Sequence, residues 1–414
     1  MFCELTKEEY SHFQMSHEYC NFLNGVECGQ LEEMSGYSVC YVGNKENGEL
    51  TAATMLVSMP LMKKFHYFYA PRGLLINYHN LELLQQFTHD LKQYAKKKKA
   101  VYVVIDPYVL YKERDIDGNL VEGGFDNQDV VDHLIASGFH HKGFSVGYGQ
   151  NMQYIRWMYS MSLEDTDEKT LWKNLHQQTR WSINRTLKYQ MQVRELSLDE
   201  MNIFDDIMKK TGERRHFQSR QLSFYENQCQ AYGDHLKVLL AYMDVPLYRE
   251  SLNKELNQEN ENIFKAKQEL EKHPSKKFEN KLKVANEAVE ILEKKLKEAD
   301  QLEKDYGTII PMAASMFALY KDEVTYLTSG AYEEFRHFYA SYAIQWHMIQ
   351  EALKEGYKKY NFYGISGEFD EDNENYGVYK FKRGFPGQVE ELIGDFVLPT
   401  RPVLYSIYHH LREK

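Results

Sequence analysis

Residues 248–307 carry a heptad pattern that restricts this part of the chain to one kind of structure. After a His-Pro-Ser break at residues 273–275, apolar side chains recur at alternating steps of four and three, at Phe278, Leu282, Ala285, Val289, Leu292, Leu296 and Ala299. The same steps precede the break, with Glu259 in the one polar slot, at Leu252, Leu256, Ile263, Ala266 and Leu270. This spacing is typical of the seam between packed helices. Because Pro274 disfavours one continuous helix, the pattern predicts an antiparallel two-helix coiled-coil arm.

The sequence on either side of this arm has a mixed α/β pattern. Residues 87–107 and residues 346–366 each combine a helical pattern, a short basic hinge and an apolar or aromatic strand. We therefore expect an α/β (α+β) fold of two related units, with the arm inserted in the second. The predicted division is a first unit at 1–150, a second unit at 151–247 and 308–395, the arm at 248–307, and a C-terminal tail at 396–414.

Charge and cysteine content limit the classes of function. A formal net charge of −11 over 414 residues argues against general coating of nucleic acid, although a local basic patch can still bind RNA. The five cysteines form no C-x-x-C pair, which disfavours structural zinc, and their odd number favours reduced thiols in the cytoplasm. The charged N-terminal segment is not expected to be a signal peptide, and the longest apolar run, residues 52–62, is shorter than the ~20 residues that span a bilayer.

Several common catalytic motifs do not occur in the chain. There is no G-x-S-x-G elbow, no Walker loop, no H-E-x-x-H and no G-x-G-x-x-G, and no glycine-rich loop of the kind that binds coenzyme A. We therefore expect neither a cofactor nor a metal site. Serine nucleophiles, zinc hydrolysis and simple acetyl transfer are all disfavoured.

Three basic segments stand out in the second unit, at residues 179–196, 208–217 and 377–385. Each one alone is explained well by a solvated helix face with acidic neighbours. Three in one unit of an acidic protein favour a polyanionic ligand, because arginine and lysine side chains suit phosphates.

The third of these segments, GVYKFKRGF at residues 377–385, alternates basic and aromatic residues. In an extended strand, successive side chains point to opposite faces. The alternation therefore predicts a strand with Lys380 and Lys382 on one face and Tyr379, Phe381 and Arg383 on the other.

Asp106 ends a continuous apolar run of the buried-strand type, VYVVID, directly before Pro107. The carboxyl end of a strand in an α/β unit is a common ligand position, and a carboxylate there can orient an amine or accept its proton. The alternative is an ordinary turn-starting aspartate.

An ordered set of short motifs resembles the FemABX family of peptidoglycan interpeptide-bridge aminoacyltransferases, most of all its FemA and FemB branches. The motifs are FYAPRG, VIDPY, SGFHHKGF, QYIRWMYS, EFRHF, KYNFYGISGEF and NYGVYKFKRGF. The resemblance implies two acetyltransferase-like (GNAT-like) subdomains that form a cleft. It also implies transfer of an amino acid, most often glycine, from aminoacyl-tRNA to the interpeptide bridge of lipid II, at the inner face of the plasma membrane.

The resemblance also implies roles for individual residues. Lys382 matches the lysine of the family's Phe-Lys pair and becomes the candidate for oxyanion stabilisation, while Asp106 matches the aspartate that handles the acceptor amine. The substrate-binding candidates are Phe381, Arg214, Lys380, Arg383 and Tyr363. Two departures concern other positions: residues 26–37 lack the lysine that binds precursor phosphates in small members, and Gln190 replaces a turn glycine.

Other functions stay open at this point. A self-immunity relative that inserts serine or another residue into the bridge has the same overall pattern. A non-catalytic coiled-coil scaffold for other bridge transferases, or a small-molecule acetyltransferase, has a different chemistry. The arm also makes a homodimer, or a complex with a paralogous transferase, plausible.

Overall fold

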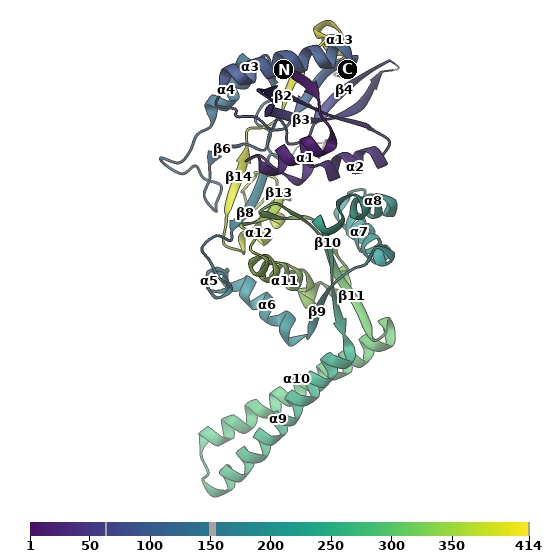
Figure 1. The fold of residues 1–414 in the computed structure, drawn as a ribbon. Coiled ribbons are helices and arrows are strands. Elements are labelled where there is room, and N and C mark those ends of the chain that lie inside the picture. The colour runs from purple at the N-terminus through teal and green to yellow at the C-terminus, as the bar shows by residue number, and fades with distance from the viewer. Residues whose placement is uncertain (63, 149–154, 413–414) are drawn as a thin grey trace.

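The computed structural model describes residues 1–62, 64–148 and 155–412, which form two mixed β-sheets and a projecting helical arm (Figure 1). The first sheet has seven strands, in the spatial order β1 (Phe2–Glu4), β2 (Ser38–Glu46), β3 (Glu49–Met62), β4 (Phe65–Ala70), β5 (Ala100–Ile105), β15 (Phe396–Pro399) and β7 (His140–His141). The helices of this unit are α1 (Lys7–Ser16), α2 (Val26–Met34), α3 (Leu81–Lys97) and α4 (Gln128–Ala136).

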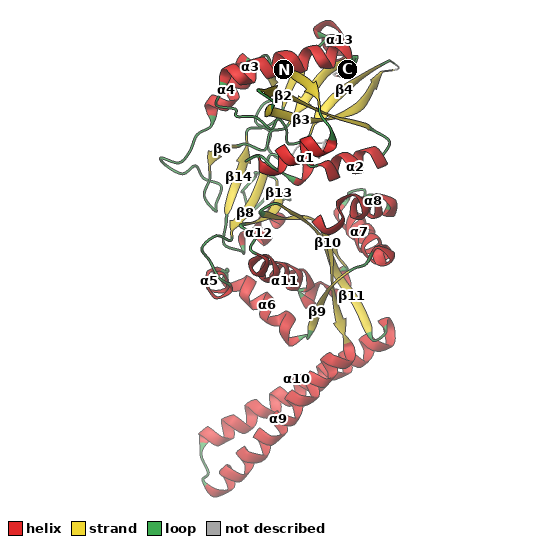
Figure 2. Cartoon of the chain, in the orientation of Figure 1, coloured by secondary structure: helices red, strands yellow, loops and turns green. Residues whose placement is uncertain are grey.

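The second sheet has eight strands and carries most of the remaining helices (Figure 2). Its spatial order is β6 (Leu110–Glu113), β14 (Gln388–Leu392), β8 (Trp157–Ser162), β13 (Lys359–Ile365), β12 (Glu323–Ala331), β11 (Ile309–Tyr320), β10 (Leu236–Asp244) and β9 (Met191–Glu195). Its helices are α5 (Glu168–Asn174), α6 (Gln177–Lys188), α7 (Met201–Arg215), α8 (Leu222–Tyr232), α11 (Ala340–Glu355) and α12 (Tyr376–Arg383).

The two sheets share one pattern of pairing. In the first, β2, β3 and β4 are antiparallel, α3 follows, and β5 then pairs in parallel with β4. In the second, β10, β11 and β12 are antiparallel, α11 follows, and β13 pairs in parallel with β12. The fold class and the internal repetition expected from residues 87–107 and 346–366 are thus confirmed.

The predicted domain boundaries differ from the structure in two places. Residues 396–399 are not part of a tail: they form β15, which lies inside the first sheet between β5 and β7. Conversely, β6 comes from the first unit but pairs with β14 of the second sheet. Both differences have one cause. Each strand pairs with a segment that is distant in the sequence, and such pairing cannot be predicted from a local sequence pattern. The predicted boundary at 150/151 lies outside the described residues.

The arm agrees with the heptad pattern. It consists of α9 (Val245–Lys272) and α10 (Lys276–Tyr306), which pack along each other and project from the second sheet (Figure 1). The side chain of Asp244 caps the first helix, and Pro246 lies in its first turn, where the missing N–H costs nothing. The seam residues Leu252, Leu292 and Ala299 are buried and join the core of the second unit. The base of the arm is therefore continuous with that core.

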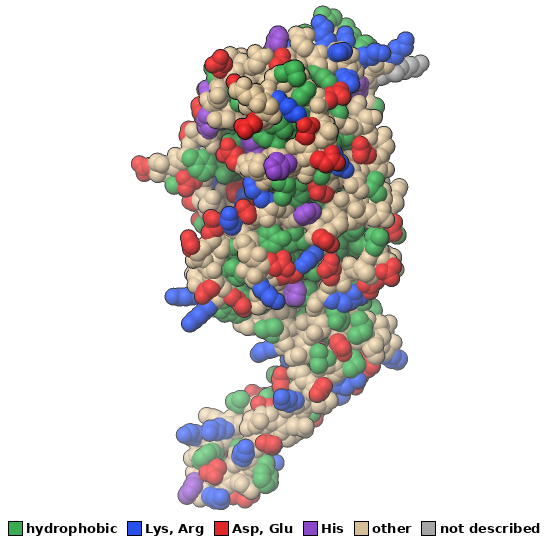
Figure 3. All heavy atoms as spheres, in the orientation of Figure 1, with side chains coloured by type: hydrophobic (Ala, Val, Ile, Leu, Met, Phe, Trp, Pro, Cys, Tyr) green, Lys and Arg blue, Asp and Glu red, His purple; other side chains and the backbone are tan. Residues whose placement is uncertain are grey.

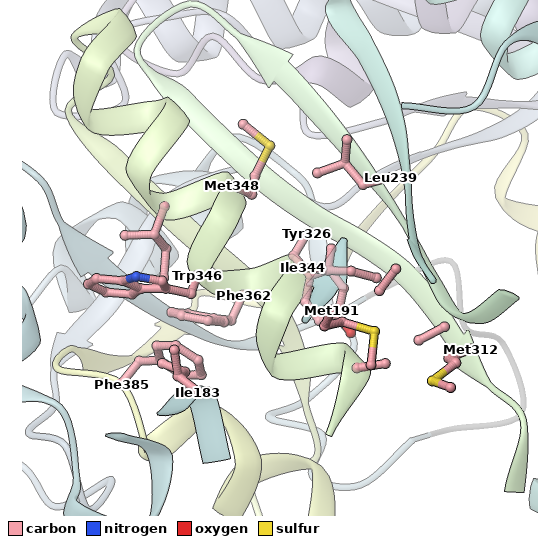
Figure 4. Close-up of a cluster of buried hydrophobic side chains, with 14 of the residues drawn as sticks. Ile183, Met191, Leu239, Met312, Tyr326, Ile344, Trp346, Met348, Phe362 and Phe385 are labelled. Atoms are coloured by element: carbon pink, nitrogen blue, oxygen red, sulfur yellow. The ribbon is translucent and has the colours of Figure 1, made fainter. Parts of the chain in front are cut away.

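The core of the second unit fixes the strand and helix that carry the candidate site. Ile344 and Trp346 of α11 pack over the sheet near Phe362 of β13, and Met348 of the same helix lies on the side of Leu239 (Figure 4). Phe385, which follows α12, packs with its ring 4.9 Å from that of Phe362. This contact holds the end of α12 against β13.

Residues 376–383 form the helix α12, so the predicted strand at residues 377–385 is wrong. The inward side chains are Tyr379 and Lys382, three positions apart, while Lys380 is exposed. Lys380 and Lys382 therefore do not share a face. Alternation over so few residues fits a helical period as well as a strand period, and here the buried positions have helical spacing.

Candidate active site

Asp106 and Arg72 form a buried ion pair where two parallel strands of the first sheet end. Ala70 of β4 pairs with Ile105 of β5, so the residues that follow these strands meet. The backbone N–H of Arg72 donates to Oδ1 of Asp106 at 2.8 Å, and its Nη1 lies 3.3 Å from Oδ2. Both side chains are almost completely buried. Asp106 is one of the site residues predicted from the sequence, whereas Arg72 is not, since its only local signal is the turn in the FYAPRG motif.

A second carboxylate, Asp395, belongs to the same group. In the antiparallel ladder of β5 and β15, Phe396 faces Ile105, so the register places Asp395 beside Asp106. Burial raises the pKa of Asp106 to about 6, against the opposing effect of Arg72. Burial and the charge of Asp106 raise the pKa of Asp395 to about 7. The three residues Asp106, Arg72 and Asp395 are called the carboxylate cluster below.

Lys382 projects from the second unit, near the C-terminal end of α12. It is 5% exposed, and its Nζ donates to the backbone carbonyl of Gly364 in β13 at 2.6 Å. Burial lowers the pKa of this amine to about 7. No carboxylate pairs with it in the part of the chain that the structure describes. Lys382 is therefore a buried amine that changes its charge near neutral pH.

A short chain of contacts connects Lys382 with the carboxylate cluster. The Nη2 of Arg72 donates to the backbone carbonyl of Ile155 at 3.1 Å, and Arg72 also hydrogen-bonds with the side chain of Tyr363. Ile155 packs on Gly364, so closely that a Cβ at that glycine would lie 3.1 Å from its side chain. Gly364 is the residue that Lys382 contacts. Asp106, Tyr363 and Lys382, three of the predicted site residues, are thus gathered around one end of β13.

The other predicted site residues are not part of this group. Phe381 packs against Tyr342 of α11, with ring centres 4.9 Å apart, and so anchors α12 on α11. The Nε of Arg383 donates to Asp117 at 2.7 Å. Lys380 is exposed over the ring of Tyr376.

Arg214 lies apart from all of them, at the end of α7. Its guanidinium pairs with Glu333, in the segment that follows β12. These contacts connect it with the end of the sheet near the arm and not with α12. Arg214 and Arg383 both have carboxylate partners, so a phosphate at either position competes with an existing ion pair.

Comparison with known proteins gives one consistent answer. A sequence model described as the FemAB family matches residues 5–413. Two relatives, each called aminoacyltransferase FemA, from Staphylococcus aureus strains bovine RF122 / ET3-1 and N315, are 36% identical over 414 residues, which is 100% of this chain and 98% of each relative. Among solved structures, the crystal structure of FemX has a TM-score of 0.82 at 25% identity and covers 98% of this chain and 99% of its own.

Proposed function

This chain belongs to the FemAB family, and on that premise we propose that it is an aminoacyltransferase that moves an amino acid from aminoacyl-tRNA to the interpeptide bridge of lipid II. Full-length similarity to proteins called aminoacyltransferase FemA carries the proposal. The buried group around β13 supports it, because it combines a carboxylate, an arginine and a weakly basic lysine. Glycine, carried by glycyl-tRNA, is the proposed donor amino acid.

The reaction itself sets three chemical requirements. The acceptor amine attacks the ester carbonyl carbon, a C–N bond forms, and a negative charge develops on the carbonyl oxygen. When this tetrahedral state collapses, the C–O bond to the tRNA ribose breaks and the ribose oxygen gains a proton. The enzyme must therefore receive a proton from the amine, stabilise the oxyanion and return a proton to the leaving oxygen.

We assign to Asp106 the receipt of the proton from the acceptor amine. With a pKa of about 6 its carboxyl is largely ionised at neutral pH, yet it is more basic than an exposed aspartate. Arg72 holds it through one backbone and one side-chain contact, and burial raises its proton affinity. Tyr363, which touches Arg72, is the proposed substrate-binding neighbour.

We assign to Lys382 both the stabilisation of the oxyanion and the protonation of the leaving ribose oxygen. When charged, its ammonium group stabilises the oxyanion, an effect worth about 3 kcal/mol in comparable sites. Because its pKa is about 7, it can also give up a proton to the leaving oxygen. Its bond to the Gly364 carbonyl fixes its position before substrate arrives. Phe381 supports it by anchoring α12.

The remaining basic candidates are proposed to neutralise phosphates of tRNA or of the lipid-linked acceptor. Lys380 is the most available, since it is exposed and near the site. Arg383 and Arg214 can act in this way only by exchanging their partners Asp117 and Glu333 for a phosphate. Of these three, Lys380 is therefore expected to matter most.

A transfer assay tests the proposal directly. Labelled glycine, serine and alanine are presented on charged tRNA, with lipid II that carries zero, one or three bridge residues as acceptor. Glycine transfer supports the housekeeping function, and serine transfer supports the self-immunity alternative. If no amino acid moves onto any acceptor, the chain is not a transferase by itself and the scaffold alternative stands.

The acceptor also determines where the protein acts. In residues 1–62, 64–148 and 155–412, no helix is long and apolar enough to cross a membrane. We propose that the protein works as a peripheral protein at the inner face of the plasma membrane, where its lipid-linked acceptor is exposed. Fractionation of cells with and without high-salt washing measures this association.

A further inference from the structure

The C-terminal helix α13 (Pro402–Arg412) has an inner face that is fixed and an outer face that is not covered. On the inner face, the ring of Tyr405 packs edge-on against Tyr102 of β5 at 5.4 Å. On the outer face, Val403 is 74% exposed and Ile407 is 52% exposed. These two aliphatic side chains lie four residues apart, so they project from the same side of the helix.

A basic run lies next to this helix, at the end of α3. Residues 96–99 are four consecutive exposed lysines. Lys98 pairs with Glu4, at 2.9 Å, whereas no ion pair engages Lys96, Lys97 or Lys99 among the residues that the structure describes. Three of the four lysines therefore carry a positive charge that forms no ion pair among the described residues.

Arg401 joins the two elements into one surface. Its Nη2 donates to the backbone carbonyl of Lys96 at 2.8 Å, and its guanidinium lies 5.7 Å from the ring centre of Phe65 at the start of β4. The α13 surface is defined here by Lys96, Lys97, Lys99, Arg401, Val403 and Ile407. Figure 1 places α3 and α13 together at the end of the molecule opposite the arm, and Figure 3 shows basic and apolar side chains at that end.

We propose that the α13 surface docks the protein on an anionic phospholipid bilayer. This inference rests on the proposed function, since a lipid-linked acceptor requires work at a membrane. Exposed lysines attract anionic headgroups, and exposed aliphatic side chains enter the boundary between headgroups and acyl chains. The formal net charge of −11 repels such a bilayer from the rest of the molecule, so the surface also sets the orientation.

The chemistry of the surface favours lipid over RNA. Phosphates of RNA also attract lysine, but RNA-binding surfaces add aromatic side chains on which bases stack. The exposed apolar residues here are aliphatic, Val403 and Ile407, and the tyrosine Tyr405 faces inward. Docking by this surface leaves the arm directed away from the bilayer, where it is accessible to a soluble partner (Figure 1).

Vesicle binding tests this proposal. The full chain is sedimented with vesicles of phosphatidylcholine alone and with vesicles that also contain phosphatidylglycerol. Two variants are compared with it: Lys96→Gln/Lys97→Gln/Lys99→Gln, which removes charge but keeps the backbone carbonyl that holds Arg401, and Val403→Ser/Ile407→Ser. We expect the original chain to bind only the anionic vesicles, and each variant to bind them at least about tenfold more weakly.

A matched control changes three exposed lysines of the arm, as Lys267→Gln/Lys294→Gln/Lys297→Gln, and should leave vesicle binding unchanged. Transfer to a water-soluble acceptor that lacks the lipid should be equal in all variants, which separates this proposal from the proposed function. If the protein binds vesicles but transfers no amino acid, bilayer docking by the α13 surface is supported and the proposed transferase function is rejected. The docking proposal is overturned if all variants bind vesicles equally. It is also overturned if the variants lose tRNA binding while vesicle binding is unchanged.

Discussion

Asp395 lies beside Asp106 at the end of the ladder between β15 and β5, so a half-buried carboxyl adjoins the buried ion pair of Asp106 and Arg72. The chain contributes them from positions almost 300 residues apart. Two carboxyl groups this close lose their protons in sequence, and the charge of Asp106 raises the pKa of Asp395 to about 7, above the value of about 6 for Asp106. The C-terminal strand thus places a second carboxyl, which titrates later, beside the group that we assign as proton acceptor.

Replacing Asp395 by Asn should leave the acid limb of the pH profile of transfer in place. Asp395, with a pKa of about 7, is still protonated and uncharged while Asp106 titrates near a pKa of about 6, so a neutral amide at position 395 should not move the rise of kcat/KM that is centred near that value. The measurement is kcat/KM against pH with charged tRNA and a soluble acceptor. The exposed Asp199→Asn serves as control. An acid limb that moves in Asp395→Asn would show that Asp395 is already charged when Asp106 loses its proton, and would overturn this order of titration.

Replacing Arg72 by Met should destabilise the fold strongly. The change leaves the carboxylate of Asp106 buried without a cation, which typically costs about 3–5 kcal/mol of unfolding free energy. Urea unfolding measures the loss in the first unit. Adding Asp106→Asn should recover much of it, because an amide needs no counter-charge and still accepts from the backbone N–H of residue 72. Additive losses in the double variant contradict the assigned pair.

These residues also show what the sequence could and could not predict. The arm was predicted well because its signal is local and is repeated over many turns. Asp106 was singled out because it ends an apolar strand before a proline. Arg72 and Asp395 were missed because their proximity depends on strand pairing between distant segments. The segment around Lys382 was singled out by its alternation of basic and aromatic residues, and the family resemblance then gave Lys382 its expected role, although the conformation was predicted wrongly.

The arm permits a comparison of adjacent residues. Leu292 is 5% exposed in the seam, whereas Ile291 is 53% exposed. Leu292→Ala should cost about 2–5 kcal/mol, since it removes a buried side chain and leaves a cavity, while Ile291→Ala should stay within about 0.5 kcal/mol. Hydrogen exchange of α9 and α10 amides measures the local effect. Equal protection of the two variants would indicate that the seam does not hold the helices together.

Lys382→Ala should keep the fold and reduce transfer at least ~100-fold, because it removes the cation assigned to the oxyanion. In the original chain, the charged form also disappears as pH rises through about 7, so the rate should fall there. Lys382→Arg keeps its charge at all these pH values and should lose this alkaline fall, even if its overall rate is lower. Single-turnover transfer over this range measures both effects. Full activity in Lys382→Ala would reject the assignment, and an identical alkaline fall in Lys382→Arg would assign that titration to another group.

The same amine should make stability depend on pH in a defined direction. The pKa of Lys382 is lowered in the folded state, from an ordinary value of 10.5 to about 7. Below about pH 7 the amine is charged in both the folded and the unfolded state, so the full cost of burying the charge is present. Between about 7 and 10.5 the unfolded state binds more protons, and stability therefore rises with pH, by at most about 1.4 kcal/mol per pH unit.

Lys382→Met removes this cost, so it should be more stable than the original chain near about pH 6, and its advantage should shrink towards about pH 9. Thermal unfolding of both proteins at the two pH values measures the change, because each difference in Tm is taken under the same conditions. Lys380→Met is the matched control, since Lys380 is exposed on the same helix and should give a difference that does not vary with pH. A constant difference for Lys382→Met as well would show that this lysine keeps an ordinary pKa in the folded protein, and would remove the basis for its role in proton transfer.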